Sequence, residues 1–241
     1  MKHIHVLMAG LLLAGMSCGG ARAAVVLDDP LDGSTLGVAS GVVYGPGNSG
    51  GIGDLAAVFD YNSTDRIKYE ASMIPQAGTV SFSIKSQFDG YDMVLDTIGG
   101  SPSTTTGDWQ VGIRPDNTLR FNVYANGTWN RLKGTTPISS DTWTYVAISF
   151  GPLYGMKLYV NGIAEGAFEA GGNYLGQLKD TAMFVGDYDG DANAWAFTGS
   201  LDDLRVSDVE NDVLLTSVPE PGSILALLGG LAGLPLLRRR R

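Results

Sequence analysis

The aspartates of one segment near the end of the chain are the residues whose type and spacing could bind a cation. In Leu201–Val206, Asp202 alternates with Leu204 and Val206, which are apolar and expected to face a core. Because successive side chains of a strand point to opposite faces, this alternation directs Asp202 inward as well. An inward carboxylate is costly unless it is hydrogen-bonded, ion-paired or bound to a cation. The sequence of this segment does not decide whether Asp202 is hydrogen-bonded, ion-paired or bound to a cation.

A second group of carboxylates lies in Gly186–Asp191, where three aspartates alternate with other residues around a glycine. This spacing is that of the start of a calcium-binding loop. An EF-hand requires Glu at loop position twelve, but Thr198 stands there when Asp187 is counted first, and no helical pattern flanks the loop. An EF-hand is therefore excluded. The segment is either a solvated acidic turn or a weaker calcium site with Asp187 and Asp189 as ligands.

Aromatic residues form the third group, because their faces can stack on sugar rings. The chain has four tryptophans and ten tyrosines. Trp129 follows the turn residues Asn126-Gly127, and Trp195 follows the acidic loop. We expect both to be exposed, either as sugar-stacking residues or as packing at the rim of the fold. Trp143 begins a long apolar segment and is expected in the core.

Residues 1–23 have the features of a signal peptide for export. A basic start precedes the apolar segment Ile4–Met16, and Ala21-Arg22-Ala23 is a cleavage site of the A-x-A type. Cys18 admits a lipoprotein interpretation, but a lipobox has a branched apolar residue three places earlier, where this chain has Gly15. We therefore expect cleavage after residue 23.

Removal of that segment excludes several kinds of active site. The single cysteine and both histidines of the chain lie within it. The remaining chain cannot form a disulfide framework, a thiol nucleophile, a Ser-His-Asp triad or a His/Cys zinc site. Carboxylate and carbonyl oxygens remain, and these are the ligands that calcium prefers.

The end of the chain has three parts. The motif Pro219–Pro221 cannot continue a helix, an apolar stretch covers Ser223–Leu237, and four arginines close the chain. As a helix the apolar stretch would span about 22 Å, less than the roughly 30 Å of a bilayer core. A short apolar tail with terminal arginines suits transient retention in the inner membrane. The residues of the motif are Pro219, Glu220, Pro221, Arg238, Arg239, Arg240 and Arg241.

This tail resembles the PEP-CTERM sorting signal of bacteria that produce exopolysaccharide. In that family an exosortase recognises the Pro-Glu-Pro motif and removes the tail. The resemblance implies that residues 218–241 are a sorting signal with a short transmembrane helix, and that the export machinery and an exosortase are partners. The alternative is a plain membrane anchor at the C-terminus.

The chain without its two ends is strongly acidic. The full sequence has 16 basic and 25 acidic residues and a formal net charge of −9. Removing both ends takes away six basic residues and one acidic residue, which leaves a net charge of −14. Such a surface repels nucleic acid and anionic membranes. We therefore expect no nucleic-acid partner.

Residues 24–217 have the pattern of one all-β domain. Apolar and polar residues alternate in short segments such as Thr79–Lys85 and Trp109–Arg114, and no amphipathic helical run of useful length occurs. Asn126-Gly127 and Asn161-Gly162 supply the positive φ angles that tight hairpin turns need. The sequence predicts an antiparallel two-sheet sandwich of short strands.

Three segments in series resemble the LamG-like, concanavalin A-like jelly roll. They are the Trp-led strand Asp141–Ile148, the hairpin Met156–Gly162, and the closing strand Phe197–Val206. Asp65–Tyr69 and Gly78–Lys85 also resemble earlier strands of that family. The resemblance implies two antiparallel sheets packed as a jelly roll.

The resemblance also implies a calcium site. In LamG-like domains the aspartate of the closing strand often holds a structural calcium ion together with oxygens of the N-terminal strand. The matching residues here are Asp202, Asp32 and Gly33. The alternative is a carboxylate satisfied by backbone N–H groups.

A LamG-like domain on a sorting tail is typical of a binding or structural protein rather than an enzyme. Few glutamates precede the tail, and no pattern places a pair of carboxylates in a cleft as a glycosidase would require. We expect an exported, noncatalytic protein of the cell surface or exopolysaccharide matrix that binds carbohydrate or another matrix component. The alternatives are a passive structural protein of the matrix and a polysaccharide hydrolase or lyase.

Overall fold

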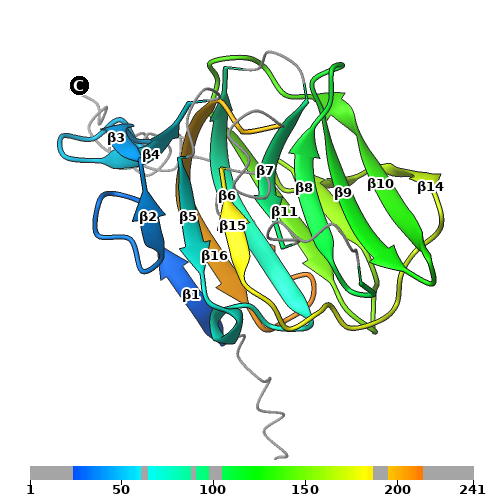
Figure 1. Ribbon diagram of the computed structural model, residues 1–241. Helices are drawn as coiled ribbons and strands as arrows, with labels where there is room; N and C mark the ends of the chain where they lie inside the picture. Colours follow the sequence, from blue (N-terminus) through cyan, green and yellow to red (C-terminus); the bar gives the residue numbers. More distant parts are fainter. Residues whose placement is uncertain (1–23, 61–64, 88–90, 98–104, 187–194, 214–241) are drawn as a thin grey trace, which may run out of the picture.

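The computed structural model describes residues 24–60, 65–87, 91–97, 105–186 and 195–213. Within these ranges the chain forms two antiparallel β-sheets packed as a jelly-roll-like sandwich (Figure 1). The expected all-β fold is therefore confirmed. The predicted signal peptide, the predicted sorting signal, and the loop residues Asp187 and Asp189 lie outside the described residues.

Sheet A brings the N-terminal strand against the last described strand. Its order is β13-β12-β11-β6-β16-β4-β3, and β1 pairs with β16. The closing strand expected from the LamG-like pattern, β16, thus lies inside the sheet between β6 and β4. The bounds are β1 (Val25–Asp29), β3 (Val43–Pro46), β4 (Leu55–Phe59), β6 (Gly78–Ser86), β11 (Thr144–Phe150), β12 (Lys157–Val160), β13 (Ile163–Glu165) and β16 (Gly199–Ser207).

Sheet B lies in front of sheet A in the view of Figure 1 and has the order β14-β10-β9-β8-β7-β15-β5-β2. Its strands are β2 (Val38–Ser40), β5 (Arg66–Tyr69), β7 (Asp92–Asp96), β8 (Trp109–Ile113), β9 (Thr118–Ala125), β10 (Thr128–Pro137), β14 (Ala167–Ala170) and β15 (Met183–Val185). A single 3₁₀ turn, η1 (Ala71–Met73), joins β5 to β6. Among the described residues no helix is both long and apolar enough to cross a membrane.

The two Asn-Gly pairs form the hairpin turns that their sequence predicts. Asn126 has φ 54° between β9 and β10, and Asn161 has φ 50° between β12 and β13. The glycines that follow them also have positive φ. These turns set the register in which side chains of β9 and β10 lie opposite each other.

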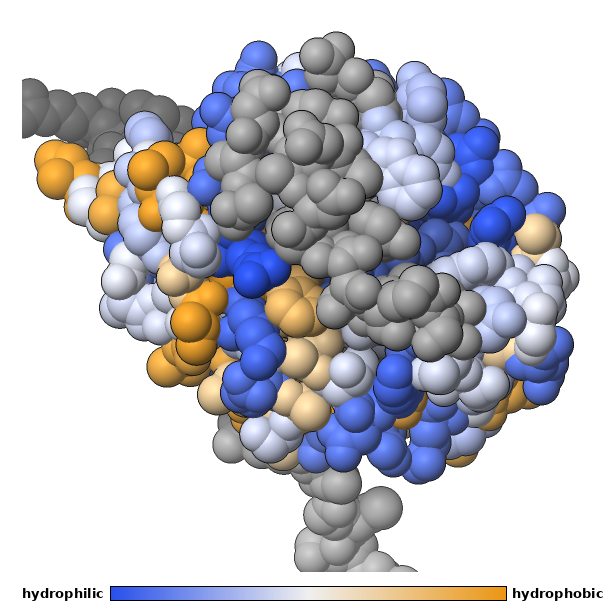
Figure 2. Space-filling view, in the orientation of Figure 1, coloured by the Kyte–Doolittle hydropathy of each residue, from blue (hydrophilic) through white to orange (hydrophobic). Residues whose placement is uncertain are grey.

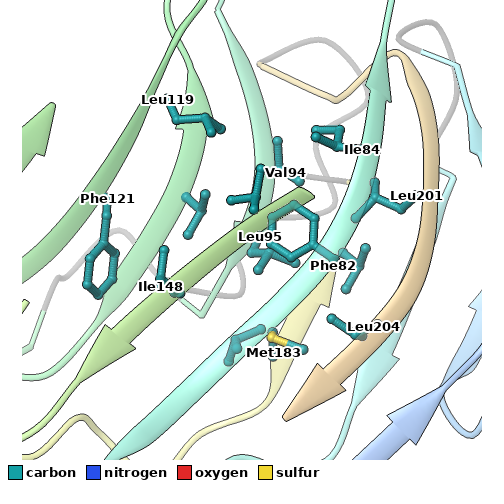
Figure 3. Packing of buried hydrophobic residues seen from close by; sticks show 14 of the residues in the cluster. Phe82, Ile84, Val94, Leu95, Leu119, Phe121, Ile148, Met183, Leu201 and Leu204 are labelled. Atoms are coloured by element: carbon teal, nitrogen blue, oxygen red, sulfur yellow. The ribbon is translucent and has the colours of Figure 1, made fainter. Parts of the chain in front are cut away.

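The core lies between the sheets, where apolar side chains of both meet in one layer (Figure 3). In β6 the alternating residues Val80, Phe82 and Ile84 are fully buried, as the sequence predicts. The labelled side chains are Phe82, Ile84, Ile148, Leu201 and Leu204 from sheet A, and Val94, Leu95, Leu119, Phe121 and Met183 from sheet B.

The expectation that Trp143 lies in the core is wrong. Its side chain is only partly buried, and the Lys85 ammonium lies 5.3 Å from the centroid of its ring. The core residues of β11 are Val146, Ile148 and Phe150, so the alternation of the strand puts Trp143 on the opposite face. The tryptophan of the core is Trp109, which is fully buried.

Candidate functional site

The side of sheet B that faces away from the core carries polar and aromatic side chains from four neighbouring strands. Along β9, Leu119, Phe121 and Val123 enter the core, so the side chains between them point outward. Directly opposite residues of antiparallel strands share a face. We call this surface the outer face of sheet B; Figure 2 views this side of the molecule. Its residues are Met93, Gln110, Gly112, Arg120, Asn122, Tyr124, Trp129, Arg131 and Lys133.

One aromatic pair lies beside this face near Arg120. The Tyr91 and Trp195 rings are tilted, with centroids 5.7 Å apart, and the Arg120 guanidinium lies 4.7 Å from the Tyr91 centroid. Trp195 is 45% exposed, which agrees with the sequence-based expectation. Its backbone is held in place because Met93 N–H donates to its carbonyl oxygen.

A second aromatic pair lies on the outer face near the Asn126-Gly127 turn. Tyr124 and Trp129 are directly opposite each other on β9 and β10, and their rings meet edge to face at 5.4 Å. Both are partly buried, so Trp129 is less exposed than the sequence predicts. Tyr124 follows Arg120 by four residues, about 13 Å along an extended strand. Along β9, the side chain of Asn122 thus lies between Tyr124 and Arg120, whose guanidinium contacts the Tyr91 ring.

Polar side chains separate the aromatic pairs. Asn122 lies opposite Gln110 on one side and Arg131 on the other, and both amides are almost fully buried. The Asn122 side-chain oxygen has no hydrogen-bond partner among the described residues. The arrangement combines aromatic surfaces with amide and guanidinium groups, which is the composition of a site that binds a polar ring compound.

Basic side chains gather on the same face. Arg114 forms an ion pair with Glu169, and Lys133 Nζ lies 2.6 Å from an oxygen of Asp116. Burial lowers the pKa of Arg120; Arg131 and Arg114 lower it further, whereas Tyr91 and Glu169 oppose the shift. The edge of this face leads into a shallow pocket of about 490 Å³ lined by Lys133, Thr135, Phe168, Glu169 and neighbouring residues.

The predicted inward orientation of Asp202 is wrong, although its side chain is buried. In β16, Leu201 lies opposite the core residue Ile84, whereas Asp202 lies opposite Ser83 and so points away from the core. The register shifts between Asp202 and Arg205, and Asp203 has φ 53°. This bulge breaks the alternation from which the orientation was inferred.

The Asp202 carboxylate is satisfied by backbone donors. It accepts hydrogen bonds from Asn48 N at 2.7 Å and Asp203 N at 2.8 Å. Burial raises the pKa of Asp202 to about 6 against these hydrogen bonds, and the charges of Asp203 and Asp54 add to the increase. The sequence analysis gave two possibilities for Asp202, a calcium ion or backbone N–H donors, and these hydrogen bonds correspond to the second.

The other predicted calcium ligands are not joined to Asp202 by any contact in the structure. Asp32 is exposed and accepts hydrogen bonds from the backbone N and the hydroxyl of Ser34, which lower its pKa. Gly33 has φ 95°, and a Cβ added there would lie 3.8 Å from the Tyr44 ring. Within the described ranges no group of three or more carboxylates could hold a metal ion. These residues do not fit a calcium cage as they stand, and the calcium site stays a prediction.

Asp29 is a buried carboxylate that the sequence did not single out. It accepts hydrogen bonds from the backbone N of Leu31 and of Leu36 and from the hydroxyls of Thr35 and Tyr69. Four donors at one carboxylate fix the chain between β1 and β2. Its role is structural.

Sequence reasoning also missed Tyr91, Arg120, Asn122 and Arg131. Leu119–Val123 alternates apolar and polar residues, which places Arg120 and Asn122 away from the core. Which residues of other strands join them depends on the register of β7 to β10, which alternation alone does not give.

Comparisons with known proteins support the fold. A family model described as the concanavalin A-like lectin/glucanases superfamily matches residues 61–211. A comparison with curated proteins found no match.

Several solved structures share the architecture at low identity. Domain 4 of AbnA, a GH43 extracellular arabinanase from Geobacillus stearothermophilus in complex with arabinotriose, has a TM-score of 0.56 at 17% identity, covering 78% of this chain and 94% of that chain. The Ruminococcus gnavus IT-sialidase CBM40 bound to α2,3-sialyllactose has a TM-score of 0.51 at 15% identity, with the same coverage. The botulinum neurotoxin serotype G binding domain has a TM-score of 0.56 at 12% identity, covering 85% and 51%.

Proposed function

Because this chain belongs to the concanavalin A-like lectin/glucanase superfamily, we propose that it is a carbohydrate-binding protein whose ligand lies on the outer face of sheet B. The observation that carries the proposal is that two aromatic contacts, Tyr91–Trp195 beside Arg120 and Tyr124–Trp129, lie on the same side of sheet B. Aromatic faces pack on the apolar faces of sugar rings, and the partly exposed side chains of Arg120 and Arg131 can donate hydrogen bonds to hydroxyl groups. Two structural neighbours were solved with bound oligosaccharides, which supports the same class of ligand.

The protein is noncatalytic in this proposal. Hydrolysis of a glycoside by the common mechanism needs two carboxyl groups facing the same bond, one of them free to donate a proton. At the edge of the outer face, Glu169 and Asp116 are each held in an ion pair with a basic residue. The hydrogen bonds that Asp116 accepts from Lys133 and Thr118 lower its pKa, which favours the ionised form rather than the protonated form that a general acid needs.

We assign the place of action from the two ends of the chain. The signal-peptide features of residues 1–23 and the resemblance of residues 218–241 to an exosortase signal support export and delivery to the cell surface or exopolysaccharide matrix. Exopolysaccharide is then the carbohydrate that the outer face of sheet B meets first.

Retention on the exopolysaccharide of the producing organism tests this function. We expect the purified protein to be retained and both Trp129→Ala and Trp195→Ala to weaken binding about ten-fold, roughly 1.4 kcal/mol each. Trp143→Ala is the matched control, because Trp143 is a partly buried tryptophan directly before β11 of sheet A. Absence of retention would favour a passive structural protein, and release of reducing sugar would favour a hydrolase.

A further inference from the structure

Two arginines of the outer face have no acidic partner among the residues that the structure describes. Arg120 and Arg131 form no ion pair with any described residue, whereas Arg114 and Lys133 on the same face each have one. The Nε atoms of both are buried without a hydrogen-bond partner. The sequence contains 25 acidic residues against 16 basic ones. Unpaired guanidinium groups are therefore unexpected in this chain.

The two arginines are also neighbours. Arg120 lies opposite Lys133, and Arg131 lies opposite Asn122, so the arginines occupy diagonal positions on β9 and β10. Diagonal residues of one face are within reach of long side chains. Like charges at such positions are unfavourable, and burial of an unpaired charge adds to that cost. An anion bound between them would remove both costs.

The aromatic residues beside Arg120 indicate what kind of molecule the anionic group belongs to. The Arg120 guanidinium packs against the Tyr91 ring, which packs against Trp195. A sugar ring on the aromatic pair would thus hold a charged substituent at the arginines. Arginine binds carboxylate and sulfate through two parallel N–H donors, which adds geometric selectivity.

We propose that the carbohydrate bound by the outer face of sheet B is anionic, with a carboxylate or sulfate group bound by Arg120 and Arg131. This rests on the proposed carbohydrate-binding function and specifies its ligand class. The net charge of −9 opposes general adsorption of polyanions. Binding of an acidic glycan is therefore local and depends on these two side chains.

The experiment measures binding of the purified full chain to three preparations of the producing organism's exopolysaccharide: untreated, carboxyl-reduced with carbodiimide and borohydride, and desulfated. Reduction converts a uronic carboxylate to a neutral hydroxymethyl group. We expect at least a ten-fold loss of affinity after one of these treatments, and the treatment responsible identifies the anion. Arg120→Gln/Arg131→Gln should bind all three preparations alike.

The matched control is Lys85→Gln/Lys157→Gln, which removes the same charge from sheet A. It should discriminate among the preparations as the unmodified protein does. Equal binding of all preparations by the unmodified protein would overturn the anionic ligand but leave the carbohydrate-binding function standing. Loss of discrimination in the control would overturn the role of Arg120 and Arg131. Failure to bind any preparation would overturn both proposals.

Discussion

At the scale of single residues, the buried carboxylates of Asp29 and Asp202 affect the stability of the fold in different ways. Asp29 accepts four hydrogen bonds, whereas Asp202 accepts two and has a raised pKa because burial outweighs them. Asp29 stabilises its loop, and Asp202 makes stability depend on pH.

Stability should decrease as the pH rises from about 4 to above 6, the interval between the pKa of an unfolded aspartate and that of folded Asp202, about 6. Over this interval the folded state retains a proton that the unfolded state has lost, so raising the pH favours unfolding. Melting temperatures of the protein and of Asp202→Asn with a chelator present check this. The melting temperature of Asp202→Asn should depend less steeply on pH than that of the unmodified protein. An equally steep dependence would contradict the raised pKa of Asp202.

The same measurement tests the predicted calcium site. Bound calcium favours the ionised carboxylate, so calcium should raise the melting temperature above pH 6 if Asp202, Asp32 and Gly33 bind it. Identical melting temperatures with calcium and with chelator would remove calcium from consideration.

Asp29→Ala should destabilise the fold by about 3 kcal/mol or more, because it leaves buried donors without an acceptor. The neighbouring Asp28→Ala is the control, because Asp28 is exposed and its removal should cost no more than about 0.5 kcal/mol. Urea unfolding of both variants measures the difference. Equal midpoints would show that the hydrogen bonds of Asp29 contribute little.

At the scale of elements, turns and bulges determine which side chains share a face. The Asn-Gly turns could be predicted because positive φ has a residue signature, and they give the β9–β10 register that joins Tyr124 to Trp129. The bulge in β16 has no such signature, since Asp203 adopts φ 53° without glycine. One extra residue there reversed the predicted face of Asp202.

Two glycines with similar backbone angles should respond differently to alanine. Gly127 has φ 74° and open space around it, so Gly127→Ala should cost only the backbone strain of about 1–2 kcal/mol. At Gly186, with φ 88°, a Cβ would lie 2.1 Å from Cδ1 of the buried Phe59 ring. Gly186→Ala should cost about 1–3 kcal/mol more than Gly127→Ala. Denaturant midpoints of the two variants measure the difference. A lower midpoint for Gly127→Ala than for Gly186→Ala would contradict the close packing of Phe59 against Gly186.

At the scale of the whole molecule, the sandwich separates stability from recognition. The inner faces of both sheets form one apolar core, and the outer face of sheet B carries the aromatic, amide and guanidinium groups. The sheet architecture could be predicted because alternation repeats in every strand. The outer face that we propose as the binding site could not be predicted, because it combines residues from four strands and from the segment before β7, and their register is set by long-range pairing.

The two ends of the chain predict a processed protein. Mass spectrometry of the native surface protein should give a C-terminus near Pro219–Gly222, as removal by an exosortase requires. A protein that still carries Arg241 would instead be held by a plain membrane anchor.

The four tryptophans allow the most direct measurement of where carbohydrate binds. Trp129 and Trp195 lie at the outer face of sheet B, Trp109 is in the core and Trp143 lies directly before β11 of sheet A. Indole N–H resonances can be followed by NMR while exopolysaccharide oligosaccharides are added. We predict that the Trp129 and Trp195 signals shift together and that the Trp109 and Trp143 signals stay in place. Shifts confined to Trp143, or no shift at any concentration, would contradict carbohydrate binding at this face.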